Sequence, residues 1–250
     1  MEEHANVEII EFKPEKLNGY TLVEGFPGLG LVGTICSKHL IEKLGMNKYG
    51  FIKSNIFTPI IRIREGKPVF PSRMFISKKH KLIVMISEQI IQKEFTDDFA
   101  RTIAEWARKK KFSRVISLNG LTSTEEMKNI YGYGASDNAV KFLKKKKIEI
   151  IKEGITSGIS AIMLLELKNC EIMAMAMLAP VKISADYAAS VKLLEKINEI
   201  FSLKMDLKSL KEEAKKVETE LSGYIEKIKA AQTQQKSLQE ATETDTPSYT

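Results

Sequence analysis

Short apolar runs alternate with helix-like segments along this chain as far as about Phe201. The runs at Tyr20–Phe26 and Lys81–Ser87 predict buried strands, and the apolar spacing of three and four residues that follows them predicts helices over Leu31–Leu44 and Thr96–Lys110. Strands that alternate with helices usually form a parallel sheet covered on both faces. The sequence therefore predicts an α/β fold, a three-layer α/β/α sandwich with a mostly parallel sheet.

The remaining elements are predicted by the same rules. Thr96 is expected to cap its helix, and Asn119-Gly120 to end a strand. A turn at 65–68 predicts an antiparallel hairpin between Ile60–Arg64 and Val69–Ser77, and Thr122–Gly134 is interpreted as a loop. Further strands are predicted at Phe51–Phe57, Arg114–Leu118, Ile148–Lys152 and Glu171–Leu178, and further helices at Ser136–Lys147, Ser157–Leu167 and Ser184–Phe201.

The composition changes after residue 202, so three regions are expected: an α/β core over 1–202, a helical extension over 203–231 and a disordered tail over 232–250. Apolar residues in the extension follow alternating spacings of four and three, which is typical of a coiled coil. Such a seam packs between copies of the chain or against another helix, and we expect it to join copies of the chain. Its proposed oligomerisation residues are Leu203, Leu207, Leu210, Val217, Leu221, Tyr224 and Ile228.

Composition and charge exclude several classes of protein. The chain has 250 residues, two cysteines and three histidines, without the clustered spacing of a metal site, so neither a metal nor a cofactor is expected. The net charge is +7, carried mostly by lysine, which is typical of a heat-adapted surface and does not favour nucleic acid as a partner. No membrane span or export signal is present in the sequence, and the expected location is the cytoplasm.

One glycine-rich motif, Gly28-Leu29-Gly30-Leu31-Val32-Gly33, follows a predicted strand and opens a helix. This is the context of a dinucleotide-binding turn, in which backbone N–H groups hold a pyrophosphate. The acidic residue that such a fold needs at the end of the next strand is missing, because residues 49–60 contain no acid. A tight turn with close helix–sheet packing is the favoured interpretation, and a small-ligand site is the alternative.

Three polar residues, Glu88, Asn119 and Asp186, lie near predicted strand ends, where open α/β sheets bind ligands. With the Gly28–Gly33 turn they could serve an enzyme that acts on a nucleoside or a phosphate ester, with Glu88 as its acid or base. Capping of a helix by Asp186 and stabilisation of a turn by Asn119 explain the same residues without catalysis. The favoured hypothesis assigns no catalytic residue and no enzymatic activity.

Several motifs in order resemble the proteasome assembly chaperone family, of the second-chaperone type. The segment Glu24–Gly33 is similar to the family signature, and Ile83–Glu88 and Ser117–Ser123 are similar to a strand ending in Ser-Glu and to an Asn/Gly turn. Three further segments resemble the closing βα unit of the family: Gly158–Leu165, Ala179-Pro180 and Asp186–Leu194. The basic extension and the tail are most similar to archaeal homologues, type B more than type A.

The resemblance implies a nucleosidase-like sandwich without demonstrated catalysis that forms homo-oligomers and acts on the core proteasome. A tetramer is favoured, with a pentamer as the alternative. The chain ends Ser248-Tyr249-Thr250, and proteasome activators end similarly in a hydrophobic residue, a tyrosine and any residue. We expect these three residues to bind pockets of the proteasome α-subunit ring, although Ser248 stands where the hydrophobic residue belongs. The function implied is that of an ATP-independent proteasome activator, assembly chaperone or both.

Overall fold

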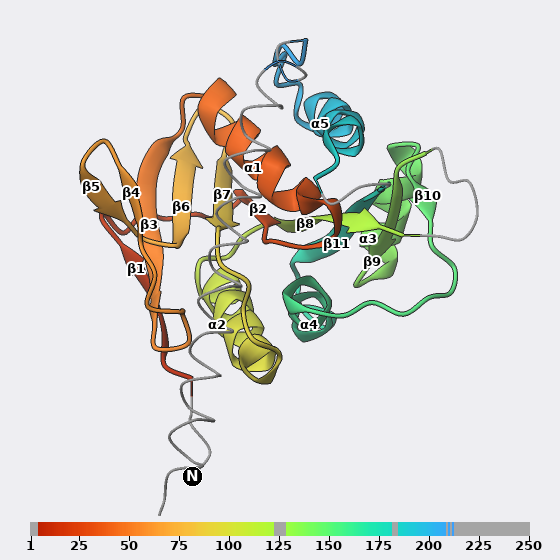
Figure 1. Ribbon diagram of the computed structural model, residues 1–250. Coiled ribbons are helices and arrows are strands. Elements are labelled where there is room, and N and C mark those ends of the chain that lie inside the picture. Colours follow the sequence, from red (N-terminus) through yellow and green to blue (C-terminus); the bar gives the residue numbers. More distant parts are fainter. Residues whose placement is uncertain (1–4, 123–128, 182–184, 209, 211, 213–250) are drawn as a thin grey trace, which may run out of the picture.

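A computed structural model describes residues 5–122, 129–181, 185–208, 210 and 212 of the chain (Figure 1). The strands in this part of the chain are β1 (Val7–Glu11), β2 (Thr21–Gly25), β3 (Asn47–Ser54), β4 (Arg62–Arg64), β5 (Lys67–Val69), β6 (Ser72–Ser77), β7 (Leu82–Ser87), β8 (Arg114–Leu121), β9 (Tyr131–Gly134), β10 (Glu149–Ile150) and β11 (Met173–Pro180). Largely apolar runs form the central strands, whereas the outer strands β1 and β3 carry more polar residues.

Helices connect many of these strands. Acidic residues occupy the first turn of α2 and basic residues its last turn, which suits the helix dipole. Ser136 caps α3, the helix predicted to start there, because its hydroxyl accepts a hydrogen bond from the Ala139 backbone N–H. The α-helices within the described residues are α1 (Val32–Lys43), α2 (Thr96–Lys109), α3 (Asp137–Lys145), α4 (Ile159–Glu166) and α5 (Tyr187–Phe201), and short 3₁₀ turns cover Leu29–Leu31 and Lys93–Phe95.

The large sheet has the strand order β1-β3-β6-β7-β2-β8-β11-β9-β10, with β4 and β5 paired in a separate hairpin. Its centre, β7-β2-β8-β11, is parallel, and β9 and β10 are parallel to each other. The remaining neighbours, β1-β3-β6-β7 and β11-β9, are antiparallel. The prediction of a mostly parallel sheet is therefore wrong for the flanks, and the sheet is mixed around a parallel centre.

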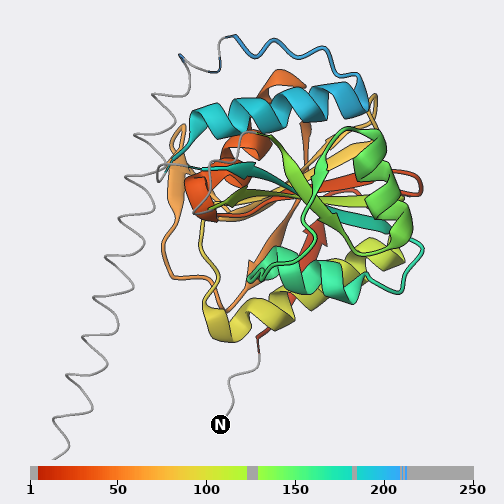
Figure 2. The ribbon, with the colours of Figure 1, turned by 90° about the vertical axis from the view of Figure 1, so that its right-hand side faces the viewer.

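Helices cover both faces of the sheet, which confirms the three-layer arrangement (Figures 1 and 2). Helices α1 and α5 lie on one face, where Cys36 and Leu194 pack with Val23 of β2. Helices α2 and α4 lie on the other face, where Phe99 and Met163 pack with the neighbouring strand residue Leu22. The alternation of Leu22 and Val23 between the two layers is the two-residue period of a strand.

Several local predictions need correction. The chain continues as a strand through Asn119-Gly120 because β8 pairs with β11 as far as Leu121. Part of the expected loop before Gly134 forms β9, which pairs with β11 and β10. Thr96 is the first residue of α2, with Phe95 at the cap position, and its hydroxyl donates back to the Gln92 carbonyl.

The hairpin prediction is confirmed in part. Strands β4 and β5 pair antiparallel around the expected turn, but the segment after Phe70 forms β6 and joins the large sheet. The predicted strand Phe51–Phe57 begins earlier and ends earlier, as β3. The N-terminal strand β1 was not predicted.

The predicted coiled-coil seam is corrected at its start. Helix α5 ends at Phe201, Ser202 adopts a left-handed conformation (φ 51°), and residues 203–207 are not helical. Leu203 and Leu210 are buried in the core beside α5, and Leu207 packs against it. These three leucines are used within the chain. The other seam residues, Val217, Leu221, Tyr224 and Ile228, and the tail residues Ser248, Tyr249 and Thr250, lie outside the described residues.

Candidate functional site

The glycine motif forms a compact turn between β2 and α1. Gly28 precedes the 3₁₀ turn Leu29–Leu31, and Gly30 lies in the left-handed region at φ 62°, which favours glycine. A β-carbon on Gly33 would lie 2.2 Å from the carbonyl oxygen of Leu118, so the first turn of α1 packs directly on the backbone of β8. Close helix–strand packing therefore explains why position 33 is a glycine. This agrees with the favoured interpretation of the motif in the sequence analysis.

A cavity of about 1150 Å³ opens beside this turn, at the carboxyl ends of β2, β8 and β11. Such strand ends are the usual ligand-binding position in open α/β sheets. Its walls come from the glycine turn, the end of β8, β9, and the segment that leads into α4. The apolar lining residues include Phe26, Leu31, Leu121, Tyr133, Ile159 and Leu178.

Two polar side chains of the lining, Asn119 and Ser160, are joined to a buried carboxyl group. The Ser160 hydroxyl donates to Glu24 Oε1 over 2.5 Å, and Asn119 Nδ2 donates to Ser160 Oγ over 3.2 Å. The side chains come from β2, β8 and α4, and Glu24 and Ser160 are 136 residues apart in the chain. The fold thus builds a small polar cluster, Glu24–Ser160–Asn119, into one side of an apolar cavity.

Glu24 is fully buried. Burial raises the pKa of its carboxyl group, and the nearby hydroxyl groups of Ser117 and Ser160 and the backbone N–H of Phe26 only partly offset the effect. Among the described residues no donor reaches Glu24 Oε2 with hydrogen-bonding geometry. The neutral acid is therefore favoured over a wider pH range than in an exposed glutamate.

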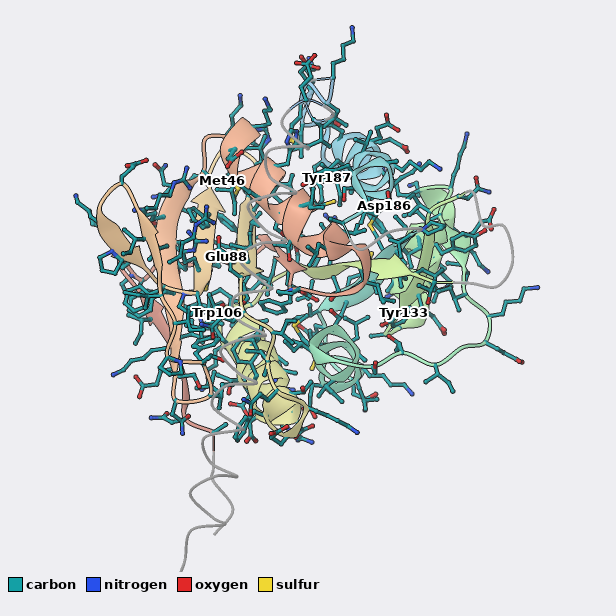
Figure 3. The ribbon with its side chains drawn as sticks, viewed as in Figure 1. Met46, Glu88, Trp106, Tyr133, Asp186 and Tyr187 are labelled. Carbon is teal, nitrogen blue, oxygen red and sulfur yellow. The ribbon has the colours of Figure 1, made fainter. Side chains whose placement is uncertain are left out.

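Glu88 lies in a different environment, next to the end of β7 and on the opposite side of β2 from β11 (Figure 3). Its Oε1 accepts hydrogen bonds from Arg62 over 2.8 Å and from Arg73 over 2.5 Å. The side chain of Glu88 is 4% exposed, and the two guanidinium groups neutralise it there. This arrangement ties the β4–β5 hairpin to the sheet and leaves Glu88 poorly suited to act as a catalytic acid or base.

Asp186 is a helix cap, which is the non-catalytic role considered for it in the sequence analysis. Its Oδ1 accepts from the Ala189 backbone N–H over 2.9 Å at the start of α5, and its own N–H donates to the Gly30 carbonyl over 2.9 Å. Asp186 therefore fastens α5 to the glycine turn. The structure does not bring Glu88, Asn119 and Asp186 together as one site.

Sequence reasoning missed the partnership of Glu24 with Ser160. A signal was present, because Glu24 is a carboxylate within the apolar run Tyr20–Phe26. Over the part of the chain that the structure describes, no group of three or more His, Cys, Asp or Glu side chains could hold a metal, and no helix has the length and apolarity to cross a bilayer.

The fold and the cavity define a class of protein, a three-layer α/β sandwich with a mixed sheet. In this protein the glycine turn packs a helix on a strand, Glu88 forms ion pairs and Asp186 caps a helix. The chain belongs to the PAC2 family, whose family model matches residues 22–225. It is also 27% identical, over 206 residues, to an uncharacterized protein of Methanocaldococcus jannaschii, an alignment that covers 82% of this chain and 85% of the relative.

Two solved structures from Pyrococcus furiosus are similar to this chain. PbaA, described as an archaeal homolog of proteasome-assembly chaperone, matches with a TM-score of 0.80 and 25% identity, over 92% of this chain and all of its own (100%). PbaB, described as an archaeal proteasome activator, matches in fold with a TM-score of 0.73 and 19% identity, over 87% of this chain and 98% of its own. The resemblance found in the sequence is thus confirmed, and both archaeal types share the fold.

Proposed function

We propose that this protein is an ATP-independent partner of the core proteasome, acting in the cytoplasm as an activator, an assembly chaperone or both. The observation that carries the proposal is the similarity to PbaA over nearly the whole chain, at 25% identity. The fold match to PbaB, a proteasome activator, supports the same direction. The structural contacts of Glu88 and Asp186 also favour a non-enzymatic role over the nucleoside or phosphate-ester enzyme.

In this proposal the chain binds the α-subunit ring through Ser248, Tyr249 and Thr250. A terminal carboxylate pairs well with a lysine in a pocket, and a tyrosine ring adds apolar contact and a hydroxyl group. Ser248 lacks the apolar side chain of the activator motif, which reduces binding by about 1–2 kcal/mol per tail. Several tails on one oligomer restore affinity through their high effective concentration.

The oligomer in this proposal is a tetramer, or alternatively a pentamer, joined through the later part of the heptad seam. Leu203, Leu207 and Leu210 pack within their own chain. The contacts between copies therefore fall to Val217, Leu221, Tyr224 and Ile228. The mass of the intact protein, measured alone and with core proteasome, tests the subunit number and the partnership together.

The test of the tail is the hydrolysis of a fluorogenic peptide by purified archaeal core proteasome without ATP. The intact chain should bind and stimulate hydrolysis, and deletion of Ser248–Thr250 should abolish both. Ser248→Leu restores the apolar position and should tighten binding roughly tenfold, which corresponds to about 1.4 kcal/mol. Ser248→Ala is the matched control and should behave as the parent.

If the chain without Ser248–Thr250 binds core proteasome and stimulates peptide hydrolysis like the parent, the tail mechanism is wrong. If the intact chain neither binds core proteasome nor changes the yield of assembled rings from α subunits, the proposed function itself is wrong. If the chain changes the yield of assembled rings but does not stimulate peptide hydrolysis, the protein is an assembly chaperone and not an activator.

A further inference from the structure

The cavity beside the glycine turn has the composition of a small-molecule site. Its volume of about 1150 Å³ is ample for a drug-sized ligand, and its walls are mostly apolar with a few polar groups, as in binding pockets generally. The charged residues of its lining are Lys152 and Glu153, one of each sign and both exposed. The walls therefore do not select a strongly charged ligand.

Ser160 presents a hydrogen-bond acceptor at this cavity. A serine hydroxyl has one proton and two lone pairs. Ser160 gives its proton to Glu24 Oε1 and uses one lone pair for Asn119 Nδ2. One lone pair remains, on a side chain that lines the cavity.

Asn119 adds both a donor and acceptors. Its NH₂ group carries two protons, of which one goes to Ser160, and its carbonyl oxygen Oδ1 lies 3.5 Å from Ser160 Oγ and has two lone pairs. A β-carbon on Gly28 would lie 3.8 Å from Oδ1, so the glycine leaves room beside the amide. The polar side of the cavity thus offers donor and acceptor groups close together.

Glu24 positions these groups without reaching the ligand. It is fully buried and does not line the cavity, and it fixes the orientation of Ser160 by accepting the hydrogen bond of the serine hydroxyl. Among the described residues Glu24 Oε2 has no hydrogen-bond partner, which costs about 1–3 kcal/mol.

We propose that the cavity binds a small uncharged molecule that carries an amide group on an apolar ring. The amide, whether exocyclic or part of the ring, bonds to Asn119 and Ser160, and the ring packs on the apolar walls near Phe26 and Tyr133. An amide matches the site because it too presents a donor beside an acceptor. Amide-bearing heterocycles such as nicotinamide and uracil belong to this class. The proposal concerns binding, and it does not depend on the proteasome.

The experiment is isothermal titration of the full chain with nicotinamide and uracil, each up to 20-fold above the protein in the millimolar range. Three comparison probes separate the contributions. N,N-dimethylnicotinamide keeps the ring and the carbonyl but loses both N–H donors, nicotinate replaces the amide by a charge, and toluene keeps only an apolar ring. At least one amide should bind, and every comparison probe should bind at least tenfold more weakly than its parent amide.

Variants assign the binding to this site. Asn119→Ala and Ser160→Ala should each weaken amide binding about tenfold, whereas Asn138→Ala, on the exposed face of α3, should leave it unchanged. Glu24→Gln keeps an acceptor for Ser160 and should retain binding within about threefold, whereas Glu24→Leu should lose it. Melting temperatures of all variants confirm that they are folded.

Three outcomes would overturn the proposal. They are the absence of amide binding, equal binding of the amide and its dimethyl analogue, and unchanged binding by folded Asn119→Ala and Ser160→Ala. If a variant does not fold, chemical-shift changes of the Asn119 side-chain amide on titration of the parent chain decide instead. No shift of that resonance counts against the site.

Discussion

The indole N–H of Trp106 donates a hydrogen bond to Glu11 Oε1 over 2.8 Å, and this contact joins helix α2 to the edge strand β1. The other oxygen of Glu11 accepts from Tyr49 and from Lys110, each over 2.6 Å. One carboxylate therefore fastens three elements, β1, β3 and α2, although its strand was not apparent from the sequence.

Replacement of Glu11 should reveal this role through the pH dependence of stability. Burial raises the pKa of Glu11, but the hydrogen bonds from Lys110, Tyr49 and Trp106 outweigh it, so the net pKa lies below the usual value. The stabilisation is complete above the unfolded value of about 4.3 and is lost as the pH falls through the folded pKa. Glu11→Gln should lower the free energy of unfolding at pH 7 by about 1–2 kcal/mol.

Urea unfolding of parent and Glu11→Gln between pH 3 and pH 7 measures this effect. The difference between the two should shrink toward the acid end. Glu8→Gln, on the same strand and exposed, is the matched control and should differ little from the parent. A constant difference over the whole range would contradict the assignment.

Glu24 should have the opposite pH dependence. Burial raises its pKa, so its contribution is fully present below the unfolded value and is lost as the pH rises through the folded pKa. Glu24→Gln keeps the shape and an acceptor for Ser160 but cannot ionise. The stability of Glu24→Gln relative to the parent should therefore increase between pH 5 and pH 9, as measured by urea unfolding, and a decrease would refute the inferred direction.

Loss of the Glu88 carboxylate should release the β4–β5 hairpin. Glu88→Gln removes the carboxylate that Arg62 and Arg73 share, and removing one partner of a largely buried ion pair costs about 3 kcal/mol. Amide hydrogen exchange in 62–69 should quicken more than exchange in the central strands. Glu65→Gln is the control, because its pair with Arg64 is exposed and 3.9 Å long. If amide hydrogen exchange in 62–69 were unchanged in Glu88→Gln, the ion pairs of Glu88 would not be what holds the hairpin to the sheet.

Gly33→Ala tests the close approach of α1 to β8. The added methyl group would lie 2.2 Å from the Leu118 carbonyl oxygen, which is a backbone atom of a central strand and cannot easily move away. We expect a loss of about 3 kcal/mol or failure to fold. Gly154→Ala, whose β-carbon would meet only the Ile151 side chain at 3.4 Å, should remain within about 0.5 kcal/mol of the parent. Thermal melts of the two variants measure the contrast, and equal melts would contradict it.

The two cysteines should react at very different rates. Cys36 is buried, its Sγ lies 3.5 Å from the Ser190 carbonyl oxygen, and burial raises the pKa of its thiol well above the usual value. Cys170 is only partly buried. A thiol reagent at pH 8 should label Cys170 in the native protein and both residues in urea. Rapid native labelling of Cys36 would mean that α1 opens from the sheet.

Secondary structure could be predicted best where the apolar pattern of one short segment is enough to identify a strand or a helix. The apolar strand at Tyr20–Phe26 and the amphipathic helix from Thr96 could be predicted because their burial follows a local period. Strand β1 could not, since Glu8 and Glu11 interrupt its apolar pattern and its stability comes from pairing with β3. Strand β9 was interpreted as a loop because Gly132 and Gly134 have low strand propensity, and β11 supplies its partners.

The candidate site was predicted only in outline. The glycine turn and Asn119 could be placed at strand ends from their order in the sequence, and the cavity lies there. The Glu24–Ser160 hydrogen bond could not be predicted, because it joins β2 to α4 through the topology of the sheet. The position of Glu88 at a strand end is apparent from the sequence, but its partners are not. Antiparallel pairing of β6 with β7 brings Arg73 to it, and the separate β4–β5 hairpin brings Arg62.

At Gly33 the backbone of α1 contacts the Leu118 carbonyl group directly, with no side chain between them to absorb a displacement. Asn119 follows Leu118 at the cavity, and α1 lies beside α5 on the opposite face of the sheet from α4 (Figure 2). A displacement of α1 at this point would therefore press directly on the backbone of β8 beside the cavity. Helix α1 and the cavity wall thus meet at two consecutive residues of β8, Leu118 and Asn119.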